Sequence, residues 1–319
     1  MKNFALIGAA GYIAPRHMKA IKETGNTLIA ALDKYDGIGI MDSHFPQAHF
    51  FTEFERFDRF VDKWHRENEK RIEYIAITTP NYLHDSHIRF ALKSGAHAIC
   101  EKPLVLNPHN IDQLKVIEEE TGKKVYNILQ LRLHDSIISL KNKIAKELEA
   151  NPNKIYDIDL TYLTSRGKWY FVSWKGDEAK SGGIASNIGV HFFDMLSWIF
   201  GPIEENVVHL KQPDANAGYM KLKNANVRWF LSVNYDHIPE ETKIAGKTTY
   251  RSITVNGEEF EFSEGFTDLH TTSYRHILEG GGFGLEEARN SINMVSTIRK
   301  LPALGLSGDY HPFCRKVLG

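Results

Sequence analysis

The sequence contains only two cysteines, Cys100 and Cys314. They show neither a metal-ligand spacing nor a disulfide framework, which fits a reducing compartment. No apolar run reaches transmembrane length, and residues 1–10 lack the full apolar core and cleavage site of a signal peptide. The net charge is only −1, so the chain has no broad basic field for nucleic acid or anionic membranes. We therefore expect a cytoplasmic protein with no nucleic-acid or membrane partner.

The chain is long enough for two domains, since it has 319 residues, of which 42% are hydrophobic and 25% are charged. In its first half, short apolar runs alternate with helical patterns, which predicts an α/β fold with a doubly wound parallel sheet. Aromatic residues recur at helical spacing between positions 51 and 64 and predict the core face of another helix. The expected strands are residues 4–7, 28–32, 72–77, 96–100 and 125–131, and the expected helices include residues 83–94 and 108–121.

A turn rich in small residues follows the first expected strand and opens a helix. It reads Gly-Ala-Ala-Gly-Tyr-Ile-Ala from Gly8 to Ala14, so a backbone could approach a pyrophosphate closely at the helix N-terminus. Asp33 ends the second strand, where a carboxylate accepts hydrogen bonds from a ribose diol and repels a 2′-phosphate. The turn and the acid together predict an NAD-binding Rossmann domain, which we place at residues 1–122. NAD is favoured over NADP.

Two further strands end in polar residues. Thr78-Thr79-Pro80-Asn81 follows residues 72–77 and would line the nicotinamide ribose, while His84 and His87 are expected to be exposed or to cap the next helix. Glu101-Lys102-Pro103 follows residues 96–100, at the carboxyl end of a strand where open α/β sheets bind ligands. Proline restricts the backbone conformation of the residue before it, so the direction of the Lys102 side chain is constrained.

The pattern changes in the second half of the chain. Residues 155–162 alternate strictly between apolar and polar, and residues 227–233 do so in part, which predicts long strands with one covered face. Asn256-Gly257 between residues 251–255 and 259–262 predicts a hairpin. We expect residues 123–319 to form an α+β domain for substrate binding and oligomerisation around a large, mostly antiparallel open sheet. An exposed face of that sheet would favour a dimer or tetramer.

A glycine-rich segment, residues 181–194, contains the candidate catalytic residues of the second half. Asn187, His191 and Asp194 share one face if the segment is helical. Such a face is a candidate site, and because no second histidine lies nearby in the sequence we expect no metal there.

These motifs together resemble the glucose–fructose oxidoreductase and inositol dehydrogenase (Gfo/Idh/MocA) superfamily of NAD(P)-dependent sugar dehydrogenases. The resemblance covers essentially the whole chain and rests on the glycine turn, Thr79-Pro80 with His84, Glu101-Lys102-Pro103, and Gly182-Gly183 leading to His191. The stretch from Gly8 to His17 looks like the branch that oxidises UDP-N-acetyl-2-amino-2-deoxy-glucuronate at C3. So do Leu269-His270-Thr271 with Ser273-Tyr274, and Gly282-Phe283 before Glu287-Ala288-Arg289.

The resemblance implies how the site residues divide their work. Many relatives carry aspartate where this chain has Asn187; an amide cannot serve as a base, so that role falls to His191 or Lys102. In one assignment His191 accepts the C3 hydroxyl proton and cationic Lys102 stabilises the alkoxide, and in the other the roles are reversed. Contacts to NAD are expected from Gly8, Ala10, Gly11, Tyr12, Ile13, Asp33, Thr79, Pro80, Asn81, His84, Glu101 and Lys102. Contacts to the sugar are expected from Arg166, Lys102, Ser186, Asn187 and His191.

A UDP-linked uronic acid needs cationic partners. Arg166, Lys168, Lys175 and Lys180 surround three aromatic residues before the glycine segment, and Arg166 is the first choice. The resembling branch supplies a 3-keto sugar nucleotide for diacetamido-uronic acids of lipopolysaccharide and O-antigen, and implies that 2-oxoglutarate recycles the cofactor. Two alternatives stay open: a dehydrogenase of a free sugar or inositol, and a non-catalytic NAD-binding regulator.

Overall fold

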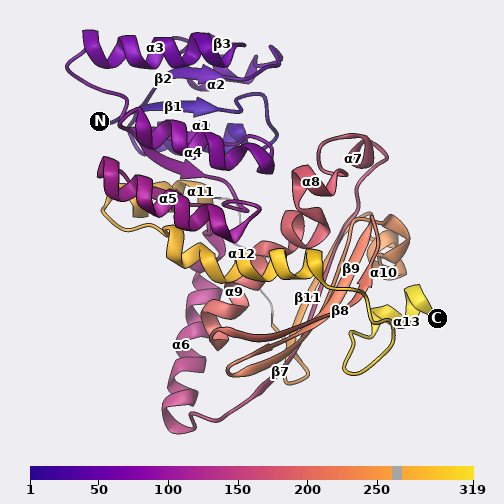
Figure 1. The fold of residues 1–319 in the computed structure, drawn as a ribbon. Helices are drawn as coiled ribbons and strands as arrows, with labels where there is room; N and C mark the ends of the chain where they lie inside the picture. The colour runs from indigo at the N-terminus through magenta and orange to yellow at the C-terminus, as the bar shows by residue number, and fades with distance from the viewer. Residues whose placement is uncertain (261–267) are drawn as a thin grey trace. The chain divides into compact units, whose positions relative to one another are not determined.

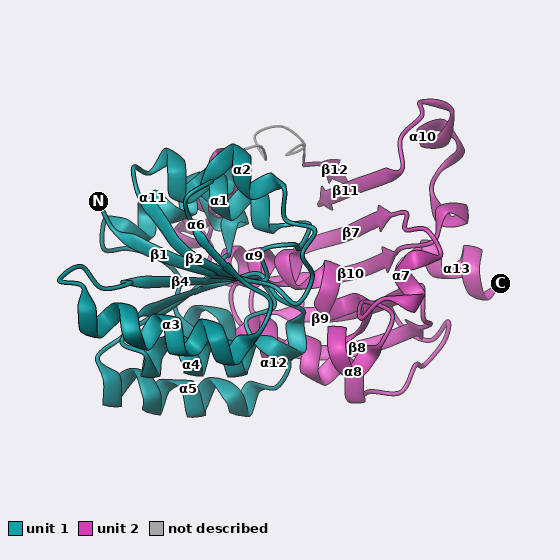
Figure 2. Ribbon diagram, turned by 90° about the horizontal axis from the view of Figure 1, so that it is seen from above, with its two compact units in different colours: residues 1–133, 267–289 teal, residues 134–266, 290–319 magenta. Residues whose placement is uncertain are grey.

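The chain folds into two compact units. In the computed structural model, which describes residues 1–260 and 268–319, unit 1 comprises residues 1–133 and 267–289 and unit 2 comprises residues 134–266 and 290–319 (Figure 2). The sequence placed the domain boundary after residue 122. Unit 1 extends beyond that point to residue 133 and also includes residues 267–289.

Unit 1 is built on a six-stranded parallel sheet of order β3-β2-β1-β4-β5-β6 (Figure 1). This arrangement confirms the doubly wound sheet expected from the alternation of strands and helices. Its strands are β1 (Asn3–Ile7), β2 (Thr27–Leu32), β3 (His49–Phe51), β4 (Tyr74–Ile77), β5 (His97–Cys100) and β6 (Val125–Asn127). Its helices are α1 (Ala14–Glu23), α2 (Ile40–His44), α3 (Phe54–Glu67), η1 (Asn81–Leu83), α4 (His84–Lys93), α5 (Pro108–Thr121), η2 (Gln130–Leu133), α11 (Leu269–Leu278) and the start of α12 (Leu285–Lys300).

The register of this sheet aligns the ends of its strands. Ile7 pairs with Leu32 on one side and with Ile77 on the other, and Ile77 pairs with Cys100. The residues that follow these four therefore leave the sheet at the same edge, where open parallel sheets bind ligands. They are Gly8, Asp33, Thr78 and Glu101.

Helices cover both faces of the sheet, which explains why its strands are nearly continuous apolar runs. All five residues of β1 are buried. Helices α1 and α11 lie on one face, and α3, α4 and α5 lie on the other (Figure 2). Tyr274 and Ile277 of α11 belong to the same buried cluster as Phe4 and Met18. A segment from the far end of the sequence thus completes the core of unit 1.

Unit 2 is built on a second six-stranded sheet, of order β12-β11-β7-β10-β9-β8. Neighbours pair antiparallel except β7 and β10, so the mostly antiparallel sheet is confirmed. Its strands are β7 (Tyr156–Thr164), β8 (Ile203–Lys211), β9 (Ala215–Leu222), β10 (Ala225–Ser232), β11 (Thr249–Val255) and β12 (Glu258–Glu259). Its helices are α6 (Asp135–Ala150), α7 (Trp169–Val172), α8 (Glu178–Ser181), η3 (Ala185–Gly189), α9 (Val190–Phe200), η4 (Tyr235–His237), α10 (Glu240–Ile244) and α13 (Phe313–Leu318), with the end of α12.

A different helix packs against each face of this sheet. The Trp229 ring on β10 contacts Phe193 of α9, with ring centroids 5.3 Å apart. The next residue, Phe230, points to the opposite face and packs 5.4 Å from Phe313 of α13. Helix α13 packs against only part of its face, since Asp157 of β7, on the same face as Phe230, is exposed.

The structure corrects some expected boundaries. The strand expected at residues 125–131 ends at Asn127 and is followed by the 3₁₀ turn η2. The hairpin at Asn256-Gly257 is confirmed, since β11 and β12 pair antiparallel and both turn residues have positive φ. Residues 261–262 of its second expected strand lie outside the described residues. None of the described helices combines the length and apolar composition of a transmembrane helix.

Candidate active site

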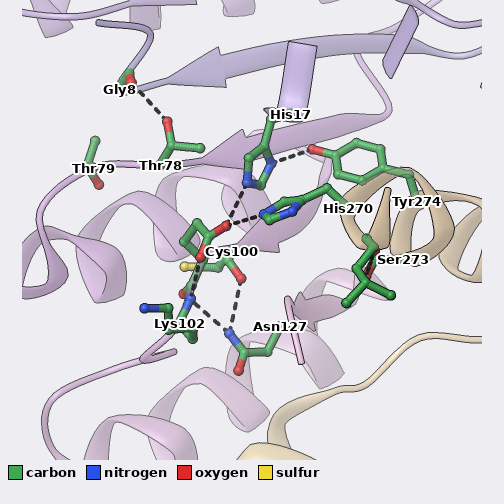
Figure 3. Close-up of polar contacts among 12 residues, drawn as sticks. Gly8, His17, Thr78, Thr79, Cys100, Lys102, Asn127, His270, Ser273 and Tyr274 are labelled. Atoms are coloured by element: carbon green, nitrogen blue, oxygen red, sulfur yellow. Dashed lines mark hydrogen bonds and ion pairs between the residues drawn. The ribbon is translucent and has the colours of Figure 1, made fainter. Parts of the chain in front are cut away.

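The glycine turn after β1 lies against the segment that follows β4. Gly8 has φ +98°, and a Cβ there would lie 2.8 Å from the backbone of Thr78 and of Thr79. The Thr78 hydroxyl donates a hydrogen bond to the Gly8 carbonyl at 2.9 Å (Figure 3). Only glycine meets both demands, so the turn approaches the neighbouring loop as closely as a bound pyrophosphate would require.

Asp33 lies at the glycine turn, as expected. One carboxylate oxygen accepts the Ala10 backbone N–H at 2.9 Å, and the other accepts the Tyr35 N–H at 3.0 Å. Tyr12, in the same turn, is 87% exposed. Ile13 is the residue before α1 and leads into its first turn. The structure thus brings the expected pyrophosphate turn and the expected ribose ligand together.

His84 is buried rather than exposed, which corrects the expectation for this residue. Its Nδ1 lies 2.8 Å from the Pro103 carbonyl and its Nε2 lies 2.9 Å from the Thr79 carbonyl. The ring therefore joins the loop after β4 to the loop after β5. Burial lowers the pKa of His84, against the smaller raising effect of the two carbonyl contacts.

His87 and Asn81 flank the same loop. The His87 Nδ1 lies 3.0 Å from the Thr79 hydroxyl, and burial lowers the pKa of His87 to about 4. Asn81 is buried at the start of η1, directly after Pro80. Two histidines of α4, His84 and His87, thus contact Thr79 in the polar turn that is expected near the nicotinamide ribose.

Glu101, directly before Lys102, is a buried carboxylate shared by two histidines. Its Oε1 lies 3.0 Å from His17 Nε2 and 2.8 Å from His270 Nε2. His17 Nδ1 in turn lies 2.8 Å from the Tyr274 hydroxyl (Figure 3). Burial alone would raise the pKa of Glu101, but the hydrogen bonds from His17 and His270 outweigh it and hold the pKa well below its usual range. We call Glu101, His17, His270 and Tyr274 the Glu101 network.

Sequence reasoning assigned no role to His17, His270 and Tyr274. His17 and His270 lie 84 and 169 residues from Glu101 in the sequence, so no local spacing connects them. All three stand in the motifs that resemble the UDP-sugar branch, and that was the only available sign of them.

In unit 2, the segment from Ala185 to Phe200 carries the other expected site residues. Ala185–Gly189 is a π-helical turn rather than the α-helix that was expected, and such turns often occur at functional sites. Asn187 is buried and donates a hydrogen bond to the Tyr170 hydroxyl at 2.8 Å. The hydroxyl of Ser186 is buried and has no hydrogen-bond partner among the described residues. His191 lies in the first turn of α9 and is partly exposed.

Cationic side chains lie on the segments around this turn. Arg166 is exposed, and its charge lowers the pKa of Tyr170 against the larger, raising effect of burial. A cavity of about 350 Å³ in unit 2 is lined by Lys175, the glycine segment Gly182–Ala185, Lys211, Arg299 and one acid, Glu178. Lys211 and Arg299 come from β8 and α12 and were not found from the sequence.

Comparison with known proteins places these features in a family. The Rossmann domain model of the Gfo/Idh/MocA oxidoreductases matches residues 2–128, and the C-terminal α/β domain model matches residues 153–278. Among curated proteins, the chain is 24% identical over 208 residues to scyllo-inositol 2-dehydrogenase (NADP(+)) IolW of Bacillus subtilis, covering 61% of this chain and 54% of that protein. The chain spans about half the length of the curated relatives it matches.

Solved structures match more completely. The WlbA (WbpB) dehydrogenase from Thermus thermophilus, in complex with NAD and alpha-ketoglutarate, has a TM-score of 0.93 and 52% identity over 98% of this chain and all of that chain. The same enzyme in complex with NAD and UDP-GlcNAcA has a TM-score of 0.93 and 51% identity over the same shares. The WlbA dehydrogenase from Bordetella pertussis, at 18% identity and a TM-score of 0.75, shares the fold. The chain belongs to the Gfo/Idh/MocA family of NAD-binding oxidoreductases.

Proposed function

We propose that the chain is an NAD-dependent sugar-nucleotide dehydrogenase that oxidises the C3 hydroxyl of UDP-N-acetyl-glucosaminuronate to the 3-keto sugar. The observation that carries this proposal is the 51% identity, over 98% of the chain, to a dehydrogenase crystallised with NAD and UDP-GlcNAcA. The alignment of the glycine turn, Asp33 and Lys102 at one edge of the parallel sheet supports a nucleotide-dependent reaction there.

The residues of unit 1 fit a dinucleotide. Gly8, Ala10, Gly11, Tyr12 and Ile13 form the turn for the pyrophosphate, and Asp33 accepts the ribose hydroxyls. The loop of Thr79, Pro80, Asn81 and His84, with Glu101 and Lys102, borders the nicotinamide side. NAD, when bound, supplies the acceptor for the hydride that leaves C3.

The proton of the C3 hydroxyl goes to a protein base while C3 loses its hydride and the C–O bond becomes a carbonyl. Either His191 takes this proton and Lys102 stabilises the negative charge on the oxygen, or the roles are exchanged. Asn187, Ser186 and Arg166 complete the substrate site, with Asn187 orienting a sugar hydroxyl from its position on Tyr170.

Cations near the glycine segment provide partners for the diphosphate and the carboxylate of the substrate. Arg166 is the first candidate, because an exposed guanidinium near Tyr170 can pair with a carboxylate or phosphate through two hydrogen bonds. The cavity lined by Lys175, Lys211 and Arg299 is the second, because three cations there outnumber one acid.

The biological setting follows from the same likeness. We infer that 2-oxoglutarate reoxidises the bound cofactor, since a WlbA relative is crystallised with alpha-ketoglutarate. We also infer a cytoplasmic homo-oligomer that supplies 3-keto sugar nucleotides for lipopolysaccharide and O-antigen biosynthesis.

Formation of NADH with defined substrates tests the function. We expect NADH with UDP-N-acetyl-glucosaminuronate, and at least tenfold lower kcat/KM with UDP-N-acetylglucosamine, free sugars or inositols. Lys102→Ala and His191→Ala are each expected to bind NAD but to lose turnover by a factor of 100 or more. Preference for a free sugar or inositol would favour the alternative dehydrogenase, and NAD binding without any turnover would favour a regulator.

The substrate cation is tested separately. Arg166→Ala is expected to raise KM for the sugar nucleotide about tenfold, because a charge-assisted pair is lost, and to leave NAD affinity unchanged. Lys146→Ala is the matched control, because Lys146 is an exposed cation on α6 outside both cation groups. An unchanged KM in the arginine variant would remove Arg166 from the site.

A further inference from the structure

The Glu101 carboxylate is almost completely removed from solvent. Glu101 is 6% exposed, and its neighbours His17 and His270 are 0% and 5% exposed. A buried carboxylate is costly unless its oxygens accept hydrogen bonds. Here Oε1 faces both histidines, and Oε2 accepts the backbone N–H of Lys102 at 3.2 Å. Both oxygens of the carboxylate are thus engaged, and one of them holds the Lys102 backbone.

Hydrogen-bond donation in the network runs from Tyr274 through His17 to Glu101. Burial raises the pKa of Tyr274 well above its usual value, so the hydroxyl keeps its proton and donates a hydrogen bond to His17 Nδ1. Burial also lowers the pKa of His17, so the ring is neutral. A neutral imidazole has one donor and one acceptor, and its Nε2–H therefore donates to Glu101. The chain of donors from Tyr274 ends on the carboxylate.

The backbone on both sides of Lys102 is fixed as well. The Asn127 side chain on β6 donates to the carbonyls of Cys100 and Glu101 at 3.0 and 3.3 Å (Figure 3). His84 contacts the carbonyl of Pro103. Lys102 itself is partly exposed. Hydrogen bonds thus fix the backbone on both sides of Lys102, while the lysine side chain stays partly exposed.

A metal ion is the other chemistry that two histidines and a glutamate suggest. Their three ligand atoms lie within 4.8 Å of one another. However, both histidine–glutamate distances are hydrogen-bond lengths, and two ligands of a tetrahedral zinc ion lie about 3.3 Å apart when each bond is about 2.0 Å. The remaining nitrogen of His17 is already engaged by Tyr274. The geometry is that of a hydrogen-bonded network.

We propose that His17, His270 and Tyr274 are positioning residues for Lys102, and that they act through Glu101. The network fixes the turn and keeps a negative charge on the residue directly before Lys102, and we expect this charge to favour the ammonium form of the lysine. Lys102 then works as the cation that stabilises the alkoxide, and His191 takes the proton. This inference rests on the proposed function, because it assigns roles within that reaction.

Several titratable groups face the carboxylate, and a pH experiment must account for them. They are His17 on α1, His270 and Tyr274 on α11, Cys100 on β5 and His84 on α4. Burial raises the pKa of Cys100 well above its usual value, so this thiol stays neutral at ordinary pH. The negative charge in the cluster is therefore on Glu101.

Two variants test the proposal in the NAD-loaded enzyme. In Glu101→Gln the amide can accept from both histidines but cannot accept from the Lys102 N–H, and the charge is gone. We expect kcat to fall about tenfold to a hundredfold, and the alkaline limb of its pH profile to move to lower pH by about one unit. Tyr274→Phe keeps the aromatic ring but removes the donor to His17 Nδ1. We expect a smaller loss of kcat and an unchanged Nε2–H tautomer, because Glu101 Oε1 still accepts from His17 Nε2.

The tautomer of His17 is read by ¹⁵N NMR in NAD-loaded protein, where the Nε2–H form is expected. Tyr156→Phe is the matched control, since it removes a buried tyrosine hydroxyl that donates to Glu147 in unit 2, 2.6 Å away. It should leave the alkaline limb and the His17 tautomer unchanged.

Three results would each overturn the proposal: an unmoved alkaline limb in Glu101→Gln, an Nδ1–H tautomer of His17, or a stoichiometric transition metal in the purified protein. The NMR and metal measurements need no sugar substrate. A wild-type protein that oxidises no sugar nucleotide would thus overturn the proposed function. The arrangement of the Glu101 network would still be tested by the tautomer of His17.

Discussion

At the scale of single residues, Asp33 is the residue that we propose selects the dinucleotide. Its two oxygens are already oriented by backbone N–H groups of Ala10 and Tyr35. A fixed carboxylate at this point accepts a ribose diol and repels a 2′-phosphate. A curated relative at 24% identity uses NADP, so membership in the family does not by itself determine the cofactor.

Replacing this carboxylate is expected to change the cofactor preference. Asp33→Ser removes the repulsion and should raise the ratio of kcat/KM for NADP to that for NAD about tenfold or more, which corresponds to about 1.4 kcal/mol. Steady-state kinetics with both cofactors measures the ratio. Asp36→Ser, at a neighbouring acid that does not contact the glycine turn, should leave it unchanged. A wild-type enzyme that already prefers NADP would contradict the assigned role of Asp33.

The sequence pointed to those candidate site residues that a local motif marks, such as a residue at the end of a strand. Lys102 was found because a buried strand precedes it and proline follows it, and Asp33 because it ends the second strand. His17, His270 and Tyr274 could not be found in this way, because folding alone brings them to Glu101. The burial of His84 was missed for the same reason, since both carbonyls that it contacts lie outside its helix.

At the scale of elements, local patterns predicted strands and helices well where burial is simple. Helix α5 begins and ends at the expected residues, and the hairpin at Asn256-Gly257 formed as expected. The π-helical turn η3 was not predicted, because one extra residue in a helical turn leaves no mark in an apolar pattern. The return of α11 to unit 1 depends on core contacts, such as those of Tyr274 and Ile277, that the order of the elements does not reveal.

The π-helical turn ends at a glycine that is closely packed. A Cβ on Gly189 would lie 2.5 Å from Leu231 Cδ1 and 2.9 Å from Phe193 Cε2, and both of those side chains are fully buried. Gly189→Ala should therefore push η3 away from β10, lower the free energy of unfolding by about 1–3 kcal/mol and reduce kcat by displacing Asn187. Denaturant unfolding and NADH formation measure the two effects.

Gly37→Ala is the control for this substitution, since nothing lies within 4 Å of the position where its Cβ would stand. It should change the free energy of unfolding by no more than about 0.5 kcal/mol. NAD affinity should stay the same in Gly189→Ala, because the residues assigned to NAD belong to unit 1 and Gly189 lies in unit 2. An alanine at position 189 that leaves both stability and kcat intact would show that the turn can relax.

At the scale of the whole molecule, buried histidines link stability to pH. His87 in unit 1 and His311 in unit 2 each have a pKa lowered from 6.5 to about 4, with burial as the main cause. Asp159 raises and Arg228 lowers the pKa of His311 by smaller amounts. Below pH 6.5 the unfolded chain binds protons at these rings and the folded chain does not. The stability they contribute is thus fully present above about pH 6.5 and is lost as the pH falls towards 4.

Each of these two rings should contribute up to about 3 kcal/mol to the loss of stability across this window. Glu101 acts in the same direction at lower pH, because its pKa is held well below the usual range and its stabilisation is lost as the pH falls through that value. Denaturant unfolding at pH 7.5, 6.5, 5.5 and 4.5 measures the slope. His311→Gln should flatten it between pH 6.5 and 4.5, while His109→Gln, at an exposed ring on α5, should not. Equal slopes in all three proteins would mean that folding does not lower the pKa of His311.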